Sequence, residues 1–498
     1  MKTLEKLFMC IAVTGLFFSC SKYDQPDSEI SGLSGTNSVS NAIMQEVTYI
    51  VMPNGTDDTE TMKNAFSEAV NHGPGAVVQL MEGEYHINFI EICDFSGTFR
   101  GAGKGKTVIT TVEDLDVDAL IGLNLNTILI RFVRGNVHLC DMTIKTPPGP
   151  LSSGTETWID GLVGFSAYTI QTYLVKSGDE YINAVINNVD FIGHWDNCGH
   201  GLKAEFGCRT GVKVLGGWLL SNTNITITNC LFDDFLYSGA LIWHIKDGKI
   251  KVGTINNGNV FNNILGSHTD SSVGYGSLGV WMNINVEISI IDNTFNNPDG
   301  AWFAINLWRA PYLVFLESVP QIKTTICNIE RNIFNITGGE GGILMNDRRR
   351  NFYPEEEPMH VQVKNNLFNM SNDAHSGIEC YRTSGTIIRN NIFTGSGYRG
   401  IWMCTGTIAN DKGHFCENGL MLGNNFSKTL FSIAAVQLNS RSRNWTIVGG
   451  SLRESIIDNG FNNIITGMNV NTSDVSLGQT IVDNFELRRE LMDNLDDQ

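Results

Sequence analysis

Basic residues are scarce in this sequence: 34 lysines and arginines stand against 52 aspartates and glutamates, and the formal net charge is -18. Nucleic-acid binding needs a basic surface for the phosphates, so this balance argues against a nucleic-acid partner. The cysteines also lack the paired CxxC motifs of structural zinc sites, and we predict no bound metal from them. We interpret most of them as small buried side chains, while Cys198/Cys208 and Cys404/Cys416 are candidate disulfides after export.

Long apolar runs are missing after the first twenty residues, so we expect no membrane-spanning helix there. The N-terminus has two lysines, an apolar run over 7–18 that is too short to span a bilayer, and then Ser19-Cys20. This pattern resembles a bacterial lipoprotein signal, in which Cys20 becomes the lipidated first residue of the exported protein. We therefore expect a signal over 1–20, a flexible tether over 21–46, and a lipid anchor in the outer membrane as the contact with the membrane.

Helical periodicity is also rare, and a short motif repeats in its place. An asparagine followed closely by a phenylalanine recurs roughly every 25 to 41 residues, a spacing typical of solenoids with variable loops. The motifs are NNVDF (187–191), TNCLF (228–232), GNVF (258–261), DNTF (292–295), RNIF (331–334), NNLF (365–368), NNIF (390–393) and NNF (424–426). Each leads through a polar loop into a second β segment, which often starts with glycine, and a third β segment precedes the next motif. Three β segments per coil predict a parallel β-solenoid over 47–480, followed by an acidic tail over 481–498.

The two residue types of the motif have physical reasons to recur. Asparagine tolerates left-handed backbone at a tight bend, and stacked amides can hydrogen-bond along the axis. Phenylalanine then fills the interior of the coil. This pattern resembles the right-handed parallel β-helix of the pectate-lyase-like superfamily, which implies an all-β fold and activity on polysaccharides.

The segment 51–109 resembles the entry segment of that superfamily more specifically. Asp57 can cap a helix with Glu60 three residues on, and an apolar stripe follows on one face. The stripe consists of Met62, Ala65, Phe66, Ala69 and Val70. Such an N-terminal capping helix can cover the open end of a solenoid, which otherwise exposes unpaired strand edges.

Two further features of the superfamily are not matched well. The stretch CGHGLK (198–203) resembles the Gly-His-Gly of polygalacturonase-type hydrolases, but their paired aspartates and Arg-Ile-Lys are not recovered, and Gly201 also fits the repeat. We therefore favour a structural interpretation of this stretch over a shared active site. Pectate lyases use calcium, but no cluster of aspartates supports a calcium site here, so no cofactor is predicted.

The second β segment of each coil points to a binding face. If the residue after each glycine points inward, alternate residues point outward. The outward pairs are then Lys203/Glu205, Leu241/Trp243, Trp281/Asn283, Trp302/Ala304, Leu344/Asn346, Glu379/Tyr381, Trp402/Cys404 and Ala435/Gln437. We interpret this face as a groove where sugar rings stack on aromatic side chains. The alternative is that loops fold over the tryptophans and form a minor core. The predicted substrate-binding residues are Lys203, Glu205, Trp243, Trp281, Trp302, Tyr381 and Trp402.

Rung spacing restricts the catalytic candidates on this face. Strands stack about 4.8 Å apart, so Glu205 and Glu379, five rungs apart, lie about 24 Å from each other and cannot form one glycosidase pair. Glu379 is therefore expected to work with residues of nearby loops. A lyase needs a base for the proton beside a uronate carboxyl and a cation for that carboxyl, roles that His375, Arg348 or Arg382 can fill. The catalytic candidates are Asp347, Arg348, Asp373, His375, Glu379 and Arg382.

These features lead to a hypothesis of a lipid-anchored β-helix protein that acts on an extracellular polysaccharide. It cleaves glycosidic bonds as a lyase or as a hydrolase. The alternatives are a glycan-binding protein without catalysis, which uses the same aromatic residues, and a purely structural solenoid.

Overall fold

The computed structural model of this chain describes most of the region after residue 45. The described residues are 46–115, 117, 127–148, 158–166, 181–197, 205–215, 222–245, 247–266, 276–282, 286–309, 325–347, 358–371, 374–403, 415–449, 455–466, 469–470 and 480–481. The expected signal with Cys20, nearly all of the tether and the acidic tail lie outside them and stay predictions. Within the described residues, no helix has both the length and the apolar character needed to cross a membrane.

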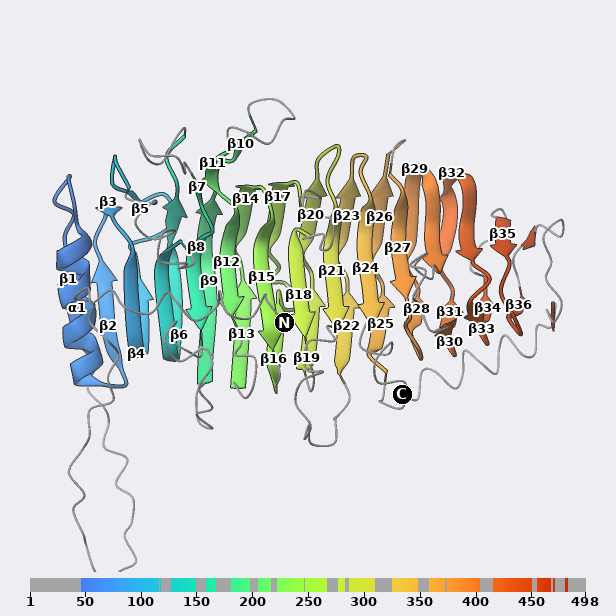
Figure 1. Cartoon of the computed structure of the whole chain (residues 1–498), viewed down its shortest axis with the longest axis horizontal. Coiled ribbons are helices and arrows are strands. Elements are labelled where there is room, and N and C mark those ends of the chain that lie inside the picture. Colours follow the sequence, from blue (N-terminus) through green and yellow to red (C-terminus); the bar gives the residue numbers. More distant parts are fainter. Residues whose placement is uncertain are drawn as a thin grey trace, which may run out of the picture. The chain divides into compact units, whose positions relative to one another are not determined.

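The described strands wind into three parallel sheets that run along a common axis (Figure 1). The phenylalanine sheet comprises β3 (Gly83–Ile87), β5 (Thr107–Thr111), β14 (Leu231–Phe235), β17 (Val260–Ile264), β20 (Thr294–Asn297), β23 (Ile333–Ile336) and β26 (Leu367–Met370). The tryptophan sheet comprises β8 (Gly161–Ser166), β12 (Thr210–Leu215), β15 (Ser238–Ile245), β18 (Leu278–Met282), β21 (Phe303–Arg309), β24 (Gly341–Asp347), β27 (Ser376–Tyr381), β35 (Ser455–Asp458) and β37 (Asn469–Val470).

The third sheet comprises β1 (Val47–Val51), β2 (Ala76–Leu80), β13 (Asn222–Thr228), β16 (Asp247–Val252), β19 (Val286–Ile291), β22 (Ile326–Glu330), β25 (His360–Lys364), β28 (Ile387–Arg389), β31 (Leu420–Leu422), β34 (Thr446–Val448), β36 (Ile464–Thr466) and β38 (Thr480–Ile481). Longer strands turn a corner and join two or all three sheets: β4 (Ile90–Arg100), β6 (Ile128–Lys145), β9 (Tyr181–Ile192), β29 (Ile392–Met403) and β32 (Asn425–Leu438). Two small sheets pair β7 (Trp158–Ile159) and β10 (Asp196–Asn197) with β11 (Glu205–Cys208), and β30 (Cys416–Glu417) with β33 (Ser442–Arg443).

In two coils, an asparagine dipeptide forms the corner before the phenylalanine sheet. The first residue has left-handed backbone, as at Asn365 (φ 58°) and Asn390 (φ 54°), a conformation that asparagine tolerates. The second residue is buried and hydrogen-bonds along the axis: Asn366 Nδ2 donates to Asn391 Oδ1 at 3.0 Å. The same contact links Asn259 to Asn293 and Asn293 to Asn332. The expected bend and amide ladder are confirmed.

The phenylalanines of the motif stack inside the β-helix. From Phe191 to Phe426, successive rings lie nearly parallel with centroids 4.6–5.1 Å apart, one coil above the next. This distance matches the spacing of parallel strands, so each ring contacts the ring of the next coil. The expected role of phenylalanine in the interior is therefore confirmed.

A column of small residues on the tryptophan sheet faces this stack. A Cβ at Gly239 would lie 2.7 Å from side-chain atoms of both Phe232 and Phe261, and one at Gly377 would lie 2.5 Å from Phe393. These separations are too short for carbon atoms, so a larger residue at Gly239 or Gly377 would require the rings to shift.

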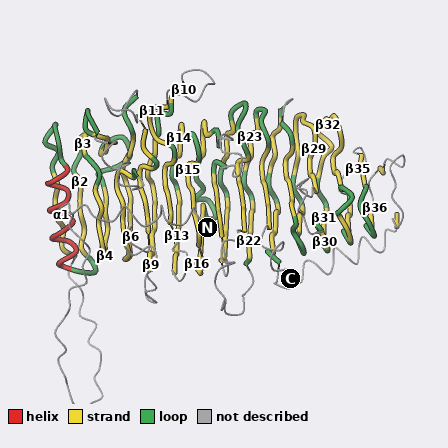
Figure 2. The backbone as a smooth tube through the Cα atoms, viewed as in Figure 1, coloured by secondary structure: helices red, strands yellow, loops and turns green. Residues whose placement is uncertain are grey.

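Helix α1 (Thr59–His72) packs on the first coils at the β1 end of the β-helix (Figure 2). Phe66 on its buried face contacts Phe95, Phe99 and Phe132, with ring centroids 5.0–5.8 Å apart. The capping helix is confirmed, and its stripe is buried except for the half-buried Val70. The capping residue differs from the expectation by one position. The N-cap is Asp58, while the carboxylate of Asp57 accepts the backbone N–H of Thr59 at 2.9 Å.

The described cysteines do not form the candidate disulfides. Cys208 and Cys416 are free and buried, so neither Cys198/Cys208 nor Cys404/Cys416 is linked. Burial raises the pKa of the Cys416 thiol, which keeps it protonated and unreactive. Cys93, in contrast, is disulfide-bonded.

Candidate functional site

The outward row of the tryptophan sheet places Glu379 between two different neighbours. Glu379 on β27 pairs in register with Leu344 on β24 and with Trp402 on β29. The row continues to Gln437 on β32. A single outward carboxylate therefore lies between an apolar side chain and an aromatic one.

The carboxylate of Glu379 is buried and surrounded by donors. Its side chain is 3% exposed. Oε1 accepts the hydroxyl of Ser376 at 2.6 Å and lies 3.0 Å from Nδ1 of His375, and Oε2 accepts the hydroxyl of Tyr381 at 3.2 Å. An ionised carboxylate is purely an acceptor, so these contacts suit a charged and firmly held Glu379.

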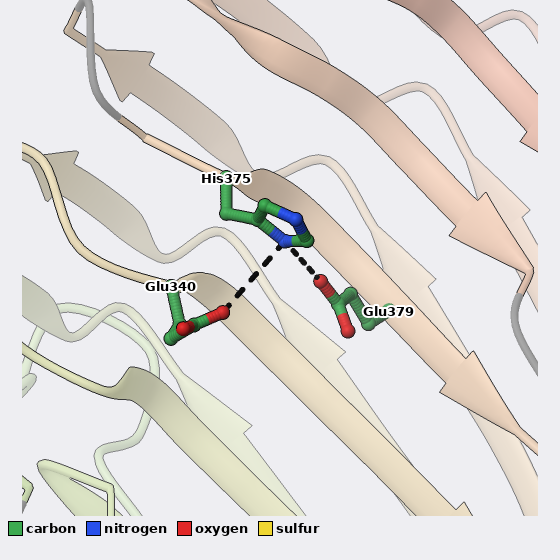
Figure 3. A group of neighbouring side chains, drawn as sticks. All are labelled: Glu340, His375 and Glu379. Atoms are coloured by element: carbon green, nitrogen blue, oxygen red, sulfur yellow. Dashed lines mark hydrogen bonds and ion pairs between the residues drawn. The ribbon is translucent and has the colours of Figure 1, made fainter. Parts of the chain in front are cut away.

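A second carboxylate faces the same histidine (Figure 3). Glu340 precedes β24, and its Oε2 lies 3.7 Å from Nδ1 of His375. The Glu340 side chain is 40% exposed and that of His375 is 30% exposed, so both can be reached from solvent, unlike Glu379. Nδ1 of His375 thus points toward negative charge on one side of the ring.

The other ring nitrogen of His375 faces a cation. Nη1 of Arg399 on β29 lies 3.1 Å from Nε2 of His375. A guanidinium can only donate, so Nε2 must accept and the ring proton must be on Nδ1. His375 is therefore a neutral imidazole that donates to Glu379 and accepts from Arg399.

Arg399 is itself held in place by two outward neighbours. Its Nε donates to Oε1 of Gln437, and its guanidinium lies 4.3 Å from the ring centroid of Trp402. The His375 ring packs edge-on against Trp402 at 5.1 Å, and Tyr398, which is 40% exposed, lies 6.0 Å from it. The site thus combines a base, a cation and two aromatic rings, with carboxylates on the far side of the base.

Glu340, His375 and Glu379 also have the residue types of a metal site. Their candidate ligand atoms all lie within 4.8 Å of one another. A metal on Nδ1 of His375 requires that nitrogen to lose its proton, whereas the contact with Arg399 places the proton there. The arrangement therefore suits proton transfer better than metal binding.

The structure brings together four of the residues that the sequence predicted: His375, Glu379, Tyr381 and Trp402. Sequence reasoning missed Glu340 and Arg399. A signal for Glu340 was present, because it stands two positions before Gly342, as His375 stands two positions before Gly377. Pairing of Gly341 with Ser376 turns this match into a contact between neighbouring coils.

Other catalytic candidates lie apart from this cluster. Asp347 forms a fully buried ion pair with Arg309 at 3.2 Å and accepts the backbone N–H of Met359. Arg382 is buried just after β27, where its Nη1 donates to Oδ1 of Asn346. Arg348 and Asp373 lie outside the described residues.

The predicted tryptophan row is corrected in its register. Trp281 pairs with Trp243 on one side and with Trp308 on the other. These residues lie in a second outward row, which also contains Tyr381 and runs two residues after the row of Glu379 on each strand. Trp308 was not predicted, while Trp302 precedes β21 and packs its ring against Phe303. Trp281 is 3% exposed, so at this rung the tryptophan is buried and does not line an open groove.

The rung assigned to Lys203 and Glu205 is also corrected. Glu205 begins β11 in a small separate sheet, and Lys203 lies outside the described residues. The outward residues of that rung are Lys213 and Leu215 on β12, which pair with Leu241 and Trp243. The ammonium of Lys213 lies 5.8 Å from the ring centroid of Trp243.

The parallel winding of three sheets per coil decides the fold. The chain is a right-handed parallel β-helix. No protein-family model and no curated protein sequence matches it.

Several solved structures are similar to this β-helix at low identity. The A-module of a mannuronan C-5 epimerase from Azotobacter vinelandii is 14% identical with a TM-score of 0.43, over 80% of this chain and 97% of that one. A catalytic unit of an α-1,3-glucanase from Streptomyces thermodiastaticus is 12% identical with a TM-score of 0.40, over 87% and 70%. A mannuronic-acid-specific polysaccharide lyase from human gut microbiota is 13% identical with a TM-score of 0.39, over 90% and 94%. Similarity at this level assigns no activity or substrate to this chain.

Proposed function

We propose that the protein is a polysaccharide lyase that cleaves a uronate-containing glycan by β-elimination, with His375 as the base. The observation that supports this most directly is the position of His375 between a buried carboxylate and a cation. Glu379 accepts from Nδ1 at 3.0 Å, and Arg399 lies against Nε2 at 3.1 Å. A carboxylate behind a histidine fixes its tautomer and orientation and strengthens the other nitrogen as a base.

Each step of the elimination has a residue in reach of the same place. The carboxylate of a uronate binds the guanidinium of Arg399, which stabilises the negative charge that develops there. Nε2 of His375 takes the proton from the carbon beside that carboxylate. The electron pair forms a carbon–carbon double bond as the bond to the leaving sugar oxygen breaks, and the hydroxyl of Tyr398 supplies a proton to that oxygen.

The charges of the site are arranged to receive an anionic sugar in one orientation. Both carboxylates lie on the Nδ1 side of His375, and Arg399 lies on the Nε2 side. The exposed Tyr398 offers a ring face near His375, on which a sugar ring can stack.

Hydrolysis is the second candidate, because the carboxylates of Glu340 and Glu379 are close together. Their ligand atoms lie within 4.8 Å, near the spacing of retaining glycosidases. Against it, a nucleophile must reach the sugar, whereas the Glu379 side chain is 3% exposed and accepts several hydrogen bonds. The lyase therefore accounts better for the burial of Glu379.

The test is incubation of the protein, without residues 1–20, with acidic and neutral polysaccharides. We expect unsaturated-product absorbance together with new reducing ends on an acidic glycan. The Glu379→Gln variant should lose at least about 100-fold in rate and keep its fold, because the base loses the carboxylate that orients it. Glu287→Gln is the matched control, since Glu287 is an exposed residue on β19 that pairs with Lys249.

Other outcomes of this assay change the proposal. Reducing ends without absorbance would establish a hydrolase, and an unchanged rate in Glu379→Gln would remove Glu379 from the mechanism. Saturable binding with no product at any enzyme concentration would indicate a glycan-binding protein. Export and a lipid anchor on Cys20 remain part of the proposal, because an extracellular polysaccharide requires a protein outside the cytoplasm.

A further inference from the structure

In the structure without substrate, the base nitrogen of His375 is covered by Arg399. Nη1 of Arg399 is 3.1 Å from Nε2, and Nδ1 faces Oε1 of Glu379 at 3.0 Å. Since an arginine has only donors, this contact exists only while Nε2 carries no proton. Both ring nitrogens of His375 are therefore engaged before any substrate binds.

The charges around His375 make this state depend on Arg399. Glu340 from the loop before β24 and Glu379 from β27 both lie on the Nδ1 side, so both carboxylates face the ring nitrogen that carries the proton. Arg399 on β29 is the described cation that faces the ring, and a proton on Nε2 would bring two positive groups into contact. The hydroxyl of Tyr381 donates to Glu379.

Arg399 is also anchored so that it can change partners without leaving the site. Its Nε is bound by Gln437, and its planar face lies on Trp402. These contacts fix the position of the guanidinium while its Nη1 atom points to the histidine. A carboxylate is a stronger partner for a guanidinium than a neutral imidazole is, because it pairs charge with charge and can bind two N–H groups at once.

We propose that Arg399 is a positioning residue that keeps Nε2 of His375 unprotonated and covered until a carboxylate replaces His375 as its partner. The role of this change of partner in catalysis rests on the proposed lyase function. It makes the site selective for uronates, since a neutral sugar has no group that can displace His375 from Arg399. The uronate carboxylate thus frees Nε2 of His375, which then removes the proton from the carbon beside that carboxylate.

The test is NMR of the 15N-labelled histidine side chains in the protein without residues 1–20, with His375→Gln to assign the signals. In the wild type at neutral pH we expect the neutral form with the proton on Nδ1. Addition of glucuronate should shift the Nε2 resonance of His375, and glucose at the same concentration should not. A wild type with the proton on Nε2, with a doubly protonated ring, or with equal responses to both sugars would overturn the proposal.

Variants of Arg399 test the cause. In Arg399→Met, the Nε2 resonance of His375 should move from its wild-type position because its hydrogen-bond donor is gone, and the response to glucuronate should disappear. Arg399→Lys should restore the response to glucuronate in part, because it keeps the charge but not the planar fork. Arg389→Met, on β28 of the third sheet, is the control and should behave as the wild type. An Nε2 resonance and a response to glucuronate like those of the wild type in a folded Arg399→Met protein would also overturn the proposal. If that variant does not fold, the two-sugar comparison in the wild type still decides.

The result is separable from the outcome of the activity assay. A protein that shows the expected proton position and the response to glucuronate, but forms no unsaturated product, keeps this inference and loses the lyase function. A protein that forms the product while His375 carries its proton on Nε2 keeps the lyase function and loses this inference.

Discussion

The phenylalanine sheet and the tryptophan sheet belong to the same coils but differ in how strictly they repeat. In the phenylalanine sheet, each coil from Phe191 to Phe426 places a ring at the same position, next to the ladder of buried asparagines. In the tryptophan sheet, the outward row that contains Glu379 changes at every coil: Lys213, Leu241, Gly279, Asn306, Leu344, Glu379, Trp402 and Gln437. Repetition therefore marks the residues that hold the coils together, and the candidate site lies in the row that does not repeat.

The largest effect on stability is expected in the middle of the phenylalanine stack. Phe334 is fully buried between Phe295 and Phe368, so Phe334→Ala removes contacts on both faces and leaves a cavity. We expect the free energy of unfolding to fall by about 3–5 kcal/mol, measured by denaturant unfolding. Ile333→Ala, one residue earlier on the outward side, is the control and should change it by less than about 1 kcal/mol. Similar losses in both variants would contradict the structural role of the stack.

An intermediate effect is expected in the asparagine ladder. Asn332 is fully buried and donates to Ile290 O at 2.9 Å and to Asn366 Oδ1 at 3.0 Å, while its own Oδ1 accepts from Asn293. Asn332→Ala leaves buried groups without partners, and we expect a loss of about 2 kcal/mol in the free energy of unfolding.

The matched control for the ladder is an asparagine on the same coil. Asn335 lies in a second row on the outer, half-buried face, where water can replace its contacts with Asn296 and Asn369. Asn335→Ala should therefore change the free energy of unfolding by about 0.5 kcal/mol. Equal effects of the two substitutions in the same unfolding experiment would show that burial of the inner ladder is not what matters.

The repeating part of the fold could be predicted from the sequence because the asparagine-phenylalanine motif recurs in successive coils. Asn365-Asn366 and Asn390-Asn391 contain the left-handed bend and the buried amide in one dipeptide. The register of the tryptophan sheet could not be predicted as well, because glycine was taken as its marker. The column beside the phenylalanine rings requires a small residue and not glycine itself, and Ser277 and Ala304 occupy it in two coils.

The candidate site was predicted only in part, because some of its contacts join different coils. Glu379 and His375 are close in sequence on one coil, so their contact could be expected from the chain itself. Glu340 and Arg399 come from the coils before and after, and their contacts with His375 depend on strand pairing that the sequence does not state. The repeat specifies that coils stack, whereas the pairing decides which side chains of different coils meet.

The smallest effect on stability is expected at the candidate site, where a substitution should change the rate more than the free energy of unfolding. Tyr381→Phe removes the hydroxyl that donates to Oε2 of Glu379 at 3.2 Å and leaves the ring in place. We expect the free energy of unfolding to change by less than about 1 kcal/mol. The rate of product formation should fall by about 10-fold, because Glu379 is then held less firmly behind His375.

The control is Tyr181→Phe, which removes a hydroxyl that accepts from Asn136 on the third sheet. This variant should leave both the free energy of unfolding and the rate unchanged. A large loss of stability with an unchanged rate in Tyr381→Phe would show that Tyr381 has a structural role, like the phenylalanine stack. The distinction between repeating structural residues and the residues of the candidate site would then not hold for Tyr381.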